Sequence, residues 1–347
     1  MRNKFTSFLA RKNIEFSVKR YLIDALSAMA TGLFASLIIG LIIKTIGEQV
    51  ANIAGDNGFS AVCVLIGGAA MAMMGPAIGA AVAHGLKAPP LVIFASIATG
   101  YMGADFGGPA GAFVAAVIGA EFGKAVSRET KVDIIVTPAV TLVAGILAAK
   151  FIGPAVSALM KGLGFIINSA TELQPFAMGI IVAVIMGLAL TAPISSAALA
   201  IMMGLSGLAA GAATIGCSAQ MIGFAIASFR DNGAGGLGAQ GLGTSMLQIS
   251  NIVKNWWIIL PPTIASAILG PVSTCIFRMT NVPEGAGMGT SGLVGQIGTL
   301  TSMGFSWEVL GSILLLHFIL PGVLAFIFDR ILRKAGRIKT GDYKLEV

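Results

Sequence analysis

Six polar side chains alternate with glycines in one short stretch, residues 228–251, and amides and hydroxyls of this kind bind ligands through hydrogen bonds. Because glycine has no side chain, the backbone N–H and C=O groups beside it can also face a ligand. The combination favours an uncharged, hydroxyl-rich ligand; the alternative is a flexible glycine-rich loop with helix caps. The spacing matches neither of the glycine-rich nucleotide-binding motifs. The six candidate substrate-binding residues are Asn232, Gln240, Thr244, Ser245, Gln248 and Asn251.

A second glycine-rich stretch, residues 281–296, contains a single carboxylate, Glu284. The apolar run that follows it is short for a helix that faces lipid, so we predict a re-entrant hairpin. A carboxylate at membrane depth is costly unless it faces a partner or water, which makes Glu284 a candidate binding residue. The alternative is a solvated helix start, because Pro283 suits the first turn of a helix and the helix dipole favours a glutamate there.

Four further polar residues within apolar segments are candidate substrate-binding residues. Asp105 interrupts a glycine-rich segment, where it either lines a solute pathway or makes a structural hydrogen bond at the break. His84 lies near Lys87 at an expected helix end, where it either binds substrate or interacts with the helix dipole. Ser195 and Ser196 follow a proline that frees a backbone carbonyl, so their hydroxyls can bond either the backbone or a substrate.

The composition is that of a protein embedded in a membrane. Of its 347 residues, 56% are hydrophobic and only 11% are charged, and the mean hydropathy is +0.90. Soluble domains carry charge at about a quarter of their positions. The net charge is +7, and many Lys and Arg residues lie near the two ends, which argues against nucleic-acid binding and predicts cytoplasmic termini. The three cysteines lack metal-binding spacing, and we expect neither a metal nor a cofactor.

Uncharged windows of about 20 residues, the length of a helix that crosses a bilayer, recur along the chain. They predict an all-α polytopic membrane protein with about ten transmembrane helices, some broken or re-entrant. Residues 88–104 and 106–120 are short and glycine-rich, with a break at residues 107–109 that is tolerated only inside protein or beside a cavity. The expected parts are an amphipathic helix at 1–20, a membrane-embedded transport domain at 21–330 and a basic cytoplasmic tail at 331–347.

Internal duplication is indicated weakly. Residues 74–81 are similar to residues 191–198, and each segment precedes a glycine-rich stretch with a polar break. Paired halves of this kind are typical of secondary transporters. Chance similarity among small residues is an equal alternative, because closely packed membrane helices are rich in glycine and alanine.

Three motifs occur in order along the chain. They are Ala192-Pro-Ile-Ser-Ser-Ala-Ala, then Asn232-Gly with Gln240-Gly-Leu-Gly-Thr-Ser-Met-Leu-Gln248, and finally Gly285-Ala-Gly-Met-Gly-Thr-Ser-Gly-Leu-Val-Gly-Gln296. Together they resemble the membrane-embedded IIC family of the phosphoenolpyruvate-dependent sugar phosphotransferase system (PTS), in particular its PfoR-like branch. The resemblance covers nearly the whole chain.

The resemblance implies a homodimer in the bacterial cytoplasmic (inner) membrane, in which a transport part moves as an elevator against a scaffold part. Better known IIC proteins bind sugar with a glutamate in a re-entrant hairpin and a nearby histidine, for which Glu284 and His84 are the nearest equivalents. This chain contains no phosphoryl-acceptor domain, so phosphorylation of the substrate would need separate soluble IIA and IIB proteins. Otherwise, this branch transports or senses its ligand without phosphorylation.

Three functions are compatible with these residues. The first is a permease for a small polar, sugar-type solute, which works by alternating access. The second is a membrane regulator that senses a ligand and signals to a partner. The third is an ion-coupled carrier of an organic anion, such as a sugar acid, in which Lys87, Lys124 or Lys254 would compensate the charge of the substrate.

Overall fold

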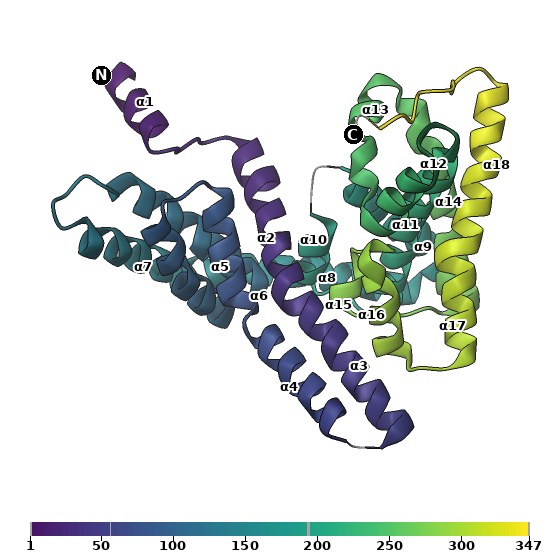
Figure 1. The fold of residues 1–347 in the computed structure, drawn as a ribbon, viewed down its shortest axis with the longest axis horizontal. Coiled ribbons are helices and arrows are strands. Elements are labelled where there is room, and N and C mark those ends of the chain that lie inside the picture. The colour runs from purple at the N-terminus through teal and green to yellow at the C-terminus, as the bar shows by residue number, and fades with distance from the viewer. Residues whose placement is uncertain (1, 56, 193–194, 346–347) are drawn as a thin grey trace. The chain divides into compact units, whose positions relative to one another are not determined.

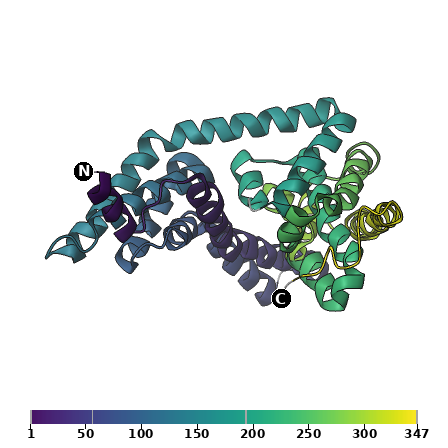
Figure 2. The same ribbon diagram turned by 90° about the horizontal axis from the view of Figure 1, so that it is seen from above.

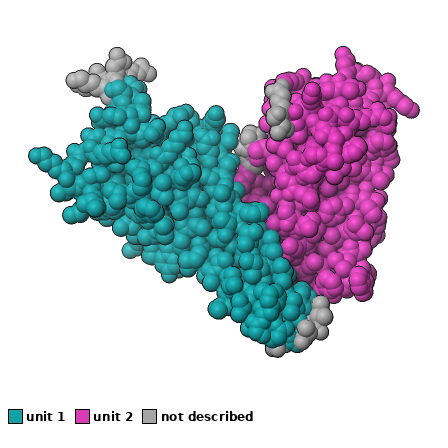
Figure 3. Space-filling model, viewed as in Figure 1, with its two compact units in different colours: residues 1–162 teal, residues 163–347 magenta. Residues whose placement is uncertain are grey.

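The computed structural model describes residues 2–55, 57–192 and 195–345, which are mainly helical and contain no strand (Figure 1). An isolated antiparallel bridge joins Gly207 and Asn281. The chain forms two compact units, Met1–Gly162 (unit 1) and Leu163–Val347 (unit 2), coloured separately in Figure 3. The helix α8 (Gly153–Leu173), the long teal helix of Figure 2, contains the boundary between them. The all-α prediction is therefore confirmed.

Six helical stretches of the described residues are long and apolar enough to cross a membrane, and a bent helix pair adds a seventh if it counts as one span. This agrees with the prediction of a polytopic membrane protein. The predicted number of about ten crossings also counted shorter apolar segments. The six stretches are Lys19–Asn52, Pro90–Val126, Asp133–Phe151, Gly207–Ala227, Trp256–Phe277 and Trp307–Lys334.

Unit 1 begins with a short helix, α1 (Arg2–Arg11), which covers part of the predicted amphipathic segment. The helix ends there because Asn13 adopts a left-handed backbone with φ of 53°. The first span then runs as one continuous helix, and α4 (Gly58–Ala72) and α5 (Met74–Gly85) follow as the pair bent by 51°. The first span consists of η1 (Lys19–Ala25), α2 (Leu26–Leu33), η2 (Phe34–Ile38) and α3 (Ile39–Ala54).

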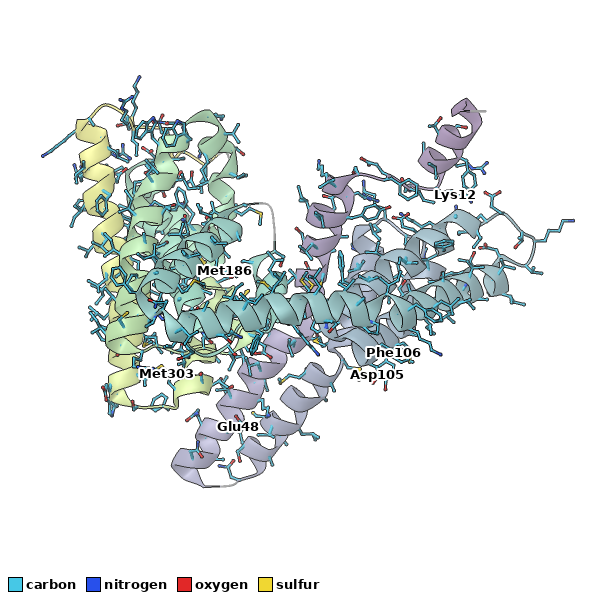
Figure 4. The ribbon with its side chains drawn as sticks, turned by 180° about the vertical axis from the view of Figure 1, so that it is seen from behind. Lys12, Glu48, Asp105, Phe106, Met186 and Met303 are labelled. Atoms are coloured by element: carbon cyan, nitrogen blue, oxygen red, sulfur yellow. The ribbon has the colours of Figure 1, made fainter. Side chains whose placement is uncertain are left out.

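The helix α6 (Pro90–Val126) is broken at Gly108, within the predicted break. Gly108 has φ of 60° and ψ of −156°, a combination that is available essentially only to glycine. The two limbs then pack with their backbones in contact, since a Cβ on Gly103 would lie 2.7 Å from the Gly111 carbonyl oxygen. Asp105 and Phe106 lie just before the turn (Figure 4). The helix α7 (Asp133–Phe151) packs along α6.

Unit 2 is built around α11 (Gly207–Ala227), whose most apolar window is 89% buried. This helix packs against α9 (Pro175–Thr191), α14 (Leu260–Pro271) and α18 (Leu320–Lys334). Small residues allow such contacts, since a Cβ on Gly216 would lie 1.9 Å from the Ala183 carbonyl oxygen. The shorter elements are α10 (Ser196–Met203), α12 (Phe229–Gly238), η3 (Ala239–Gly243), η4 (Ser245–Gln248), α13 (Ile249–Lys254), η5 (Trp256–Ile259), η6 (Val272–Phe277), α15 (Pro283–Ala286), η7 (Ser291–Leu293), α16 (Val294–Met303), α17 (Trp307–Ile313) and η8 (Leu314–Ile319).

Beyond α18 the chain folds back onto unit 2. Gly336, with φ of 70°, ends the helix, and Gly341, with φ of 95°, makes a second turn. Residues 335–345, called the C-terminal tail from here on, place Ile338 and Tyr343 in a hydrophobic cluster with Phe224 and other side chains. The segment that we predicted to be a basic cytoplasmic tail is thus packed against the protein over these residues.

Candidate functional site

The glycine-rich stretch after α11 also reverses the direction of the chain. Gly233 in α12 has φ of 60° and ψ of −157°, almost the values of Gly108 in unit 1. After this turn, η3 runs back along α11, and a Cβ on Gly241 would lie 3.5 Å from the side chains of Ala225 and Ile222. Each unit therefore contains a helical hairpin with a positive-φ glycine at its turn.

Three of the predicted amide side chains, in η3, η4 and α13, form one chain of hydrogen bonds. The Nδ2 of Asn251 donates to Gln248 Oε1 at 2.8 Å, and Gln248 Nε2 donates to Gln240 Oε1 at 2.8 Å. The Nε2 of Gln240 donates in turn to Ser228 Oγ at 2.7 Å and to the Gly236 carbonyl at 3.0 Å. Gln240 and Gln248 are fully buried. The amides thus order one another and the backbone of the turn.

The backbone of the C-terminal tail completes this network. Asn232 Nδ2 and Gln248 Nε2 both donate to the Tyr343 carbonyl, at 2.8 and 3.0 Å. Asn251 Nδ2 donates to the Lys344 carbonyl at 3.0 Å. The amides that we predicted to face a ligand therefore bond to the protein's own main chain. Sequence reasoning did not anticipate this contact, because the tail lies about 90 residues further along the chain.

Tyr343 anchors the tail. Its side chain is fully buried, and its ring meets Phe224 edge-on with 6.2 Å between the ring centroids. Its hydroxyl donates to Asp329 Oδ1 at 3.0 Å, while Arg333 pairs with Oδ2 of the same carboxylate at 2.7 Å. Burial, and after it the negative charge of Asp329, raises the pKa of Tyr343 above its ordinary value. The hydroxyl therefore stays protonated and can donate.

The second predicted stretch forms a compact hairpin in which α15 packs against α16. Asn281 at its base joins the hairpin to α11, since Asn281 Nδ2 donates to Thr214 Oγ1 at 2.7 Å and to the Gly295 carbonyl at 2.8 Å. Close packing requires glycine here, because a Cβ on Gly298 would lie 2.3 Å from Asn281 Oδ1. Asn281 was not among the predicted site residues. Its signal in the sequence was an asparagine four residues before the start of a glycine-rich run.

The tip of this hairpin, residues 287–290, meets three other segments of unit 2. Ser196 Oγ in α10 donates to the Gly287 carbonyl at 2.6 Å. Thr290 Oγ1 donates to the carbonyl of Gly241 in η3 at 2.5 Å. Gly289, with φ of 54°, lies against α11, where a Cβ on it would be 2.7 Å from the Ser218 amide nitrogen. The glycine-rich segments identified from the sequence in unit 2 therefore meet at the tip of this hairpin.

Polar side chains on α11 and on the elements next to it differ in whether they have hydrogen-bond partners. Ser218 Oγ is buried and has no hydrogen-bond partner within the described ranges. Ser245 Oγ is bonded to Thr191 Oγ1 at 2.8 Å, and Thr191 also donates to Gln220 Oε1 at 3.3 Å. Gln220 Nε2 donates to Thr263 Oγ1 at 2.9 Å. Sequence reasoning missed Gln220, because a single glutamine inside an apolar helix has no distinctive spacing.

The other predicted residues of unit 2 differ in role. Glu284 is half-buried in the first turn of α15, and its carboxylate has no hydrogen bond or ion pair with any residue that the structure describes. Ser195 Oγ accepts a backbone hydrogen bond at 3.1 Å and caps α10. Thr244 Oγ1 likewise accepts one at 3.1 Å and caps η4. Pro193 and Ile194, from the motif that precedes Ser195, lie outside the described residues.

The last two candidates, Asp105 and His84, belong to unit 1. Asp105 is exposed beside the turn of α6, and His84 is exposed in the last turn of α5. In the described part of the chain, neither side chain bonds to another candidate residue. His317, in contrast, is buried in η8 with its Nδ1 at 2.9 Å from Gln296 Nε2. Over the same residues there is no group of three His, Cys, Asp or Glu side chains that could hold a metal ion.

Comparison with known protein families identifies a match. A family model described as "Phosphotransferase system, EIIC" matches residues 23–345, which is nearly the whole chain. A search of curated proteins found no match to this chain. The matched range includes both helical hairpins, the convergence in unit 2 and the C-terminal tail as far as Leu345.

Proposed function

The chain belongs to the phosphotransferase system EIIC family, and we propose that it carries a small polar, sugar-type solute across the bacterial cytoplasmic membrane by an elevator-type movement. EIIC proteins are membrane permeases that work with other PTS components, and the apolar helices agree with this role. The proposal includes a homodimer with cytoplasmic termini, and a place in the PfoR-like branch. Soluble IIA and IIB partners would supply the phosphoryl group.

One observation carries the proposed solute site: the unpartnered carboxylate of Glu284 at the base of a hairpin whose tip joins α10, η3 and α11. A carboxylate that accepts hydrogen bonds from sugar hydroxyls makes charge-assisted bonds, which are about twice as strong as neutral ones. The hydroxyls of Ser196 and Ser218 lie on α10 and α11, and that of Ser245 lies at the start of η4, which follows η3. Glycines there bring backbone groups within reach of a ligand.

The predicted amides contribute to this site in only one state of the protein. Asn232, Gln248 and Asn251 donate to the backbone of the C-terminal tail, so they reach a solute only in a state in which the tail has left. Gln240 would then keep Gln248 in place through their 2.8 Å hydrogen bond. The capping residues Ser195 and Thr244 would shape the backbone, while Asp105 and His84 stay candidate residues of unit 1.

The test is solute uptake by cells that express Glu284→Gln, with Glu308→Gln as the matched control. Glu308 is an exposed carboxylate at the start of α17 in the same unit. Loss of hydrogen bonds to a charged group costs about 1.5–3 kcal/mol, so uptake at low solute concentration should fall about tenfold or more in Glu284→Gln. The control should transport normally. Equal uptake by both variants and the natural protein would overturn the site.

A second function, ligand-dependent regulation, is favoured by the position of the C-terminal tail on the same amides. A ligand that competes for Asn232, Gln248 and Asn251 would release the tail to a cytoplasmic partner. Deletion of residues 338–347 would then abolish a regulatory output while uptake persists. Loss of uptake in that deletion, with no change in any regulated output, would argue for the permease alone.

A further inference from the structure

We propose that unit 1 contains a binding site for the phosphate-bearing headgroup of an anionic phospholipid. The site is a basic pocket of about 550 Å³, called the Lys87 pocket here, at the end of α1, the α5–α6 loop and the end of α6. A second cavity of about 360 Å³ shares Asn13 and Lys87 with it and is also lined by Arg20. Both cavities lie among residues of unit 1, and neither contributes to the solute site proposed above.

The Lys87 pocket has an excess of positive charge. Five cationic side chains and one carboxylate line it: Arg11, Lys12, Lys87, Lys124, Arg128 and Glu129.

The single carboxylate is already paired. Glu129 Oε1 lies 2.9 Å from Arg11 and 2.5 Å from Lys12. Lys124 is neutralised from the protein interior, because its Nζ lies 2.9 Å from Glu121. Among the described residues, the exposed side chains of Lys87 and Arg128 have no ion pair. Lys87 therefore remains for an external anion, together with Arg128, whose charge also acts on the nearby Asp133 carboxylate.

The backbone of the pocket is held in place before any ligand arrives. The Leu86 carbonyl, directly before Lys87, accepts from Arg20 at 2.7 Å and from Lys124 at 3.1 Å. Lys124 also donates to the Asn13 carbonyl at 2.9 Å. A site whose groups are fixed in advance loses less entropy on binding.

Two further features indicate an anion here. Asn13, Lys87 and Arg128 are three of the five non-glycine residues with positive φ in the described ranges, and all line this pocket. Such backbone conformations are unfavourable for L-residues and tend to occur at binding sites. Arg20, whose buried Nε has no partner within those ranges, lines the adjoining cavity together with Glu15. A buried guanidinium donor without an acceptor is suited to an anionic oxygen.

Exposed apolar side chains that are close in sequence to the lining residues favour a lipid over a soluble phosphate compound. Phe16 and Val18, between α1 and Arg20, are 72% and 74% exposed. Ile134 and Ile135, just after the loop that contains Arg128, are 73% and 67% exposed. In a membrane protein such side chains contact acyl chains, while basic residues at the cytoplasmic ends of spans attract anionic headgroups. A headgroup in the pocket would leave its acyl chains against these residues.

The test is lipid binding by the full-length, detergent-solubilised protein, measured by native mass spectrometry with phosphatidylglycerol, phosphatidylcholine and inorganic phosphate. We expect phosphatidylglycerol to bind in preference to phosphatidylcholine. Lys87→Gln and Arg128→Gln should each weaken that binding about fivefold, the effect of one cation near an anionic surface. Lys161→Gln, an exposed lysine on α8 that lines neither cavity, is the matched control and should bind as the natural protein does.

Three outcomes would overturn the proposal. Equal binding of the two lipids would show that the headgroup charge is not recognised. Equal affinities in Lys87→Gln, Arg128→Gln and Lys161→Gln would place any anionic-lipid binding elsewhere. Displacement of phosphatidylglycerol by inorganic phosphate at millimolar concentration would show a site for small anions instead of lipid.

Discussion

Replacement of Tyr343 by alanine should release the C-terminal tail while the rest of the protein stays folded. The side chain is fully buried, contacts Phe224 and donates to Asp329, so its removal leaves a cavity and an unsatisfied acceptor. Loss of a large buried aromatic side chain costs about 3–5 kcal/mol. Since these contacts hold only the tail, most of this free-energy cost should favour local opening of the tail over unfolding of the whole protein. A cost of about 3 kcal/mol raises the open population about 150-fold.

Trypsin cleavage after Lys339 measures this opening, because cleavage of a locally opened segment follows its population when opening and closing are fast. Lys339 lies inside the tail, and Lys131 in the α6–α7 loop of unit 1 provides an internal control. Tyr343→Phe, which removes only the hydroxyl, should accelerate cleavage about tenfold, because a lost hydrogen bond to a charged group costs about 1.5–3 kcal/mol. Cleavage of Tyr343→Ala at the natural rate would refute the anchoring role of Tyr343, and faster cleavage after Lys131 would indicate general unfolding.

Two other predictions concern the turn at Gly233 and the pH response of unit 1. Gly233→Ala should lower the melting temperature, since its backbone conformation costs a non-glycine residue about 1–3 kcal/mol although no atom lies within 4 Å of the added Cβ. Gly235→Ala, at an equally open helical position, should leave the melting temperature unchanged or raise it. A hydrogen bond from Lys12, with the charge of Arg11, lowers the pKa of Glu129. The attachment of α1 should therefore be complete above the ordinary glutamate pKa and be lost as pH falls through the lowered pKa of Glu129. Hydrogen exchange of α1 that does not increase under acid conditions would contradict this.

The sequence predicted the elements of this fold that have a local cause. Apolar windows identified the spans, and the Gly107-Gly108-Pro109 break identified the turn of α6, because only a glycine adopts such a backbone without strain. These features depend on residue type and spacing, which a single sequence contains.

The partners of the polar side chains could not be predicted in the same way. Asn232 and Gln248 are amides in glycine-rich surroundings whether they face a sugar or the Tyr343 carbonyl. Their partner depends on where the tail packs, and that is determined by tertiary contacts of Tyr343 and Ile338. Gln220 and Asn281 were missed for the same reason, since their importance comes from neighbours on other helices.

Release of the tail distinguishes two roles of the amides: binding of the solute and support of the turn at Gly233. If Asn232, Gln248 and Asn251 bind solute, the tail competes with it, and the apparent affinity is lowered by the fraction of protein in which the tail is open. Tyr343→Ala should then bind solute more tightly than the natural protein. If the amides only support the turn at Gly233, the same variant loosens the site, and solute binding should weaken. Glu284 has no hydrogen bond or ion pair with the tail among the described residues, so Glu284→Gln should weaken binding in either background. A direct binding titration of the two single variants and the double variant therefore separates the two roles.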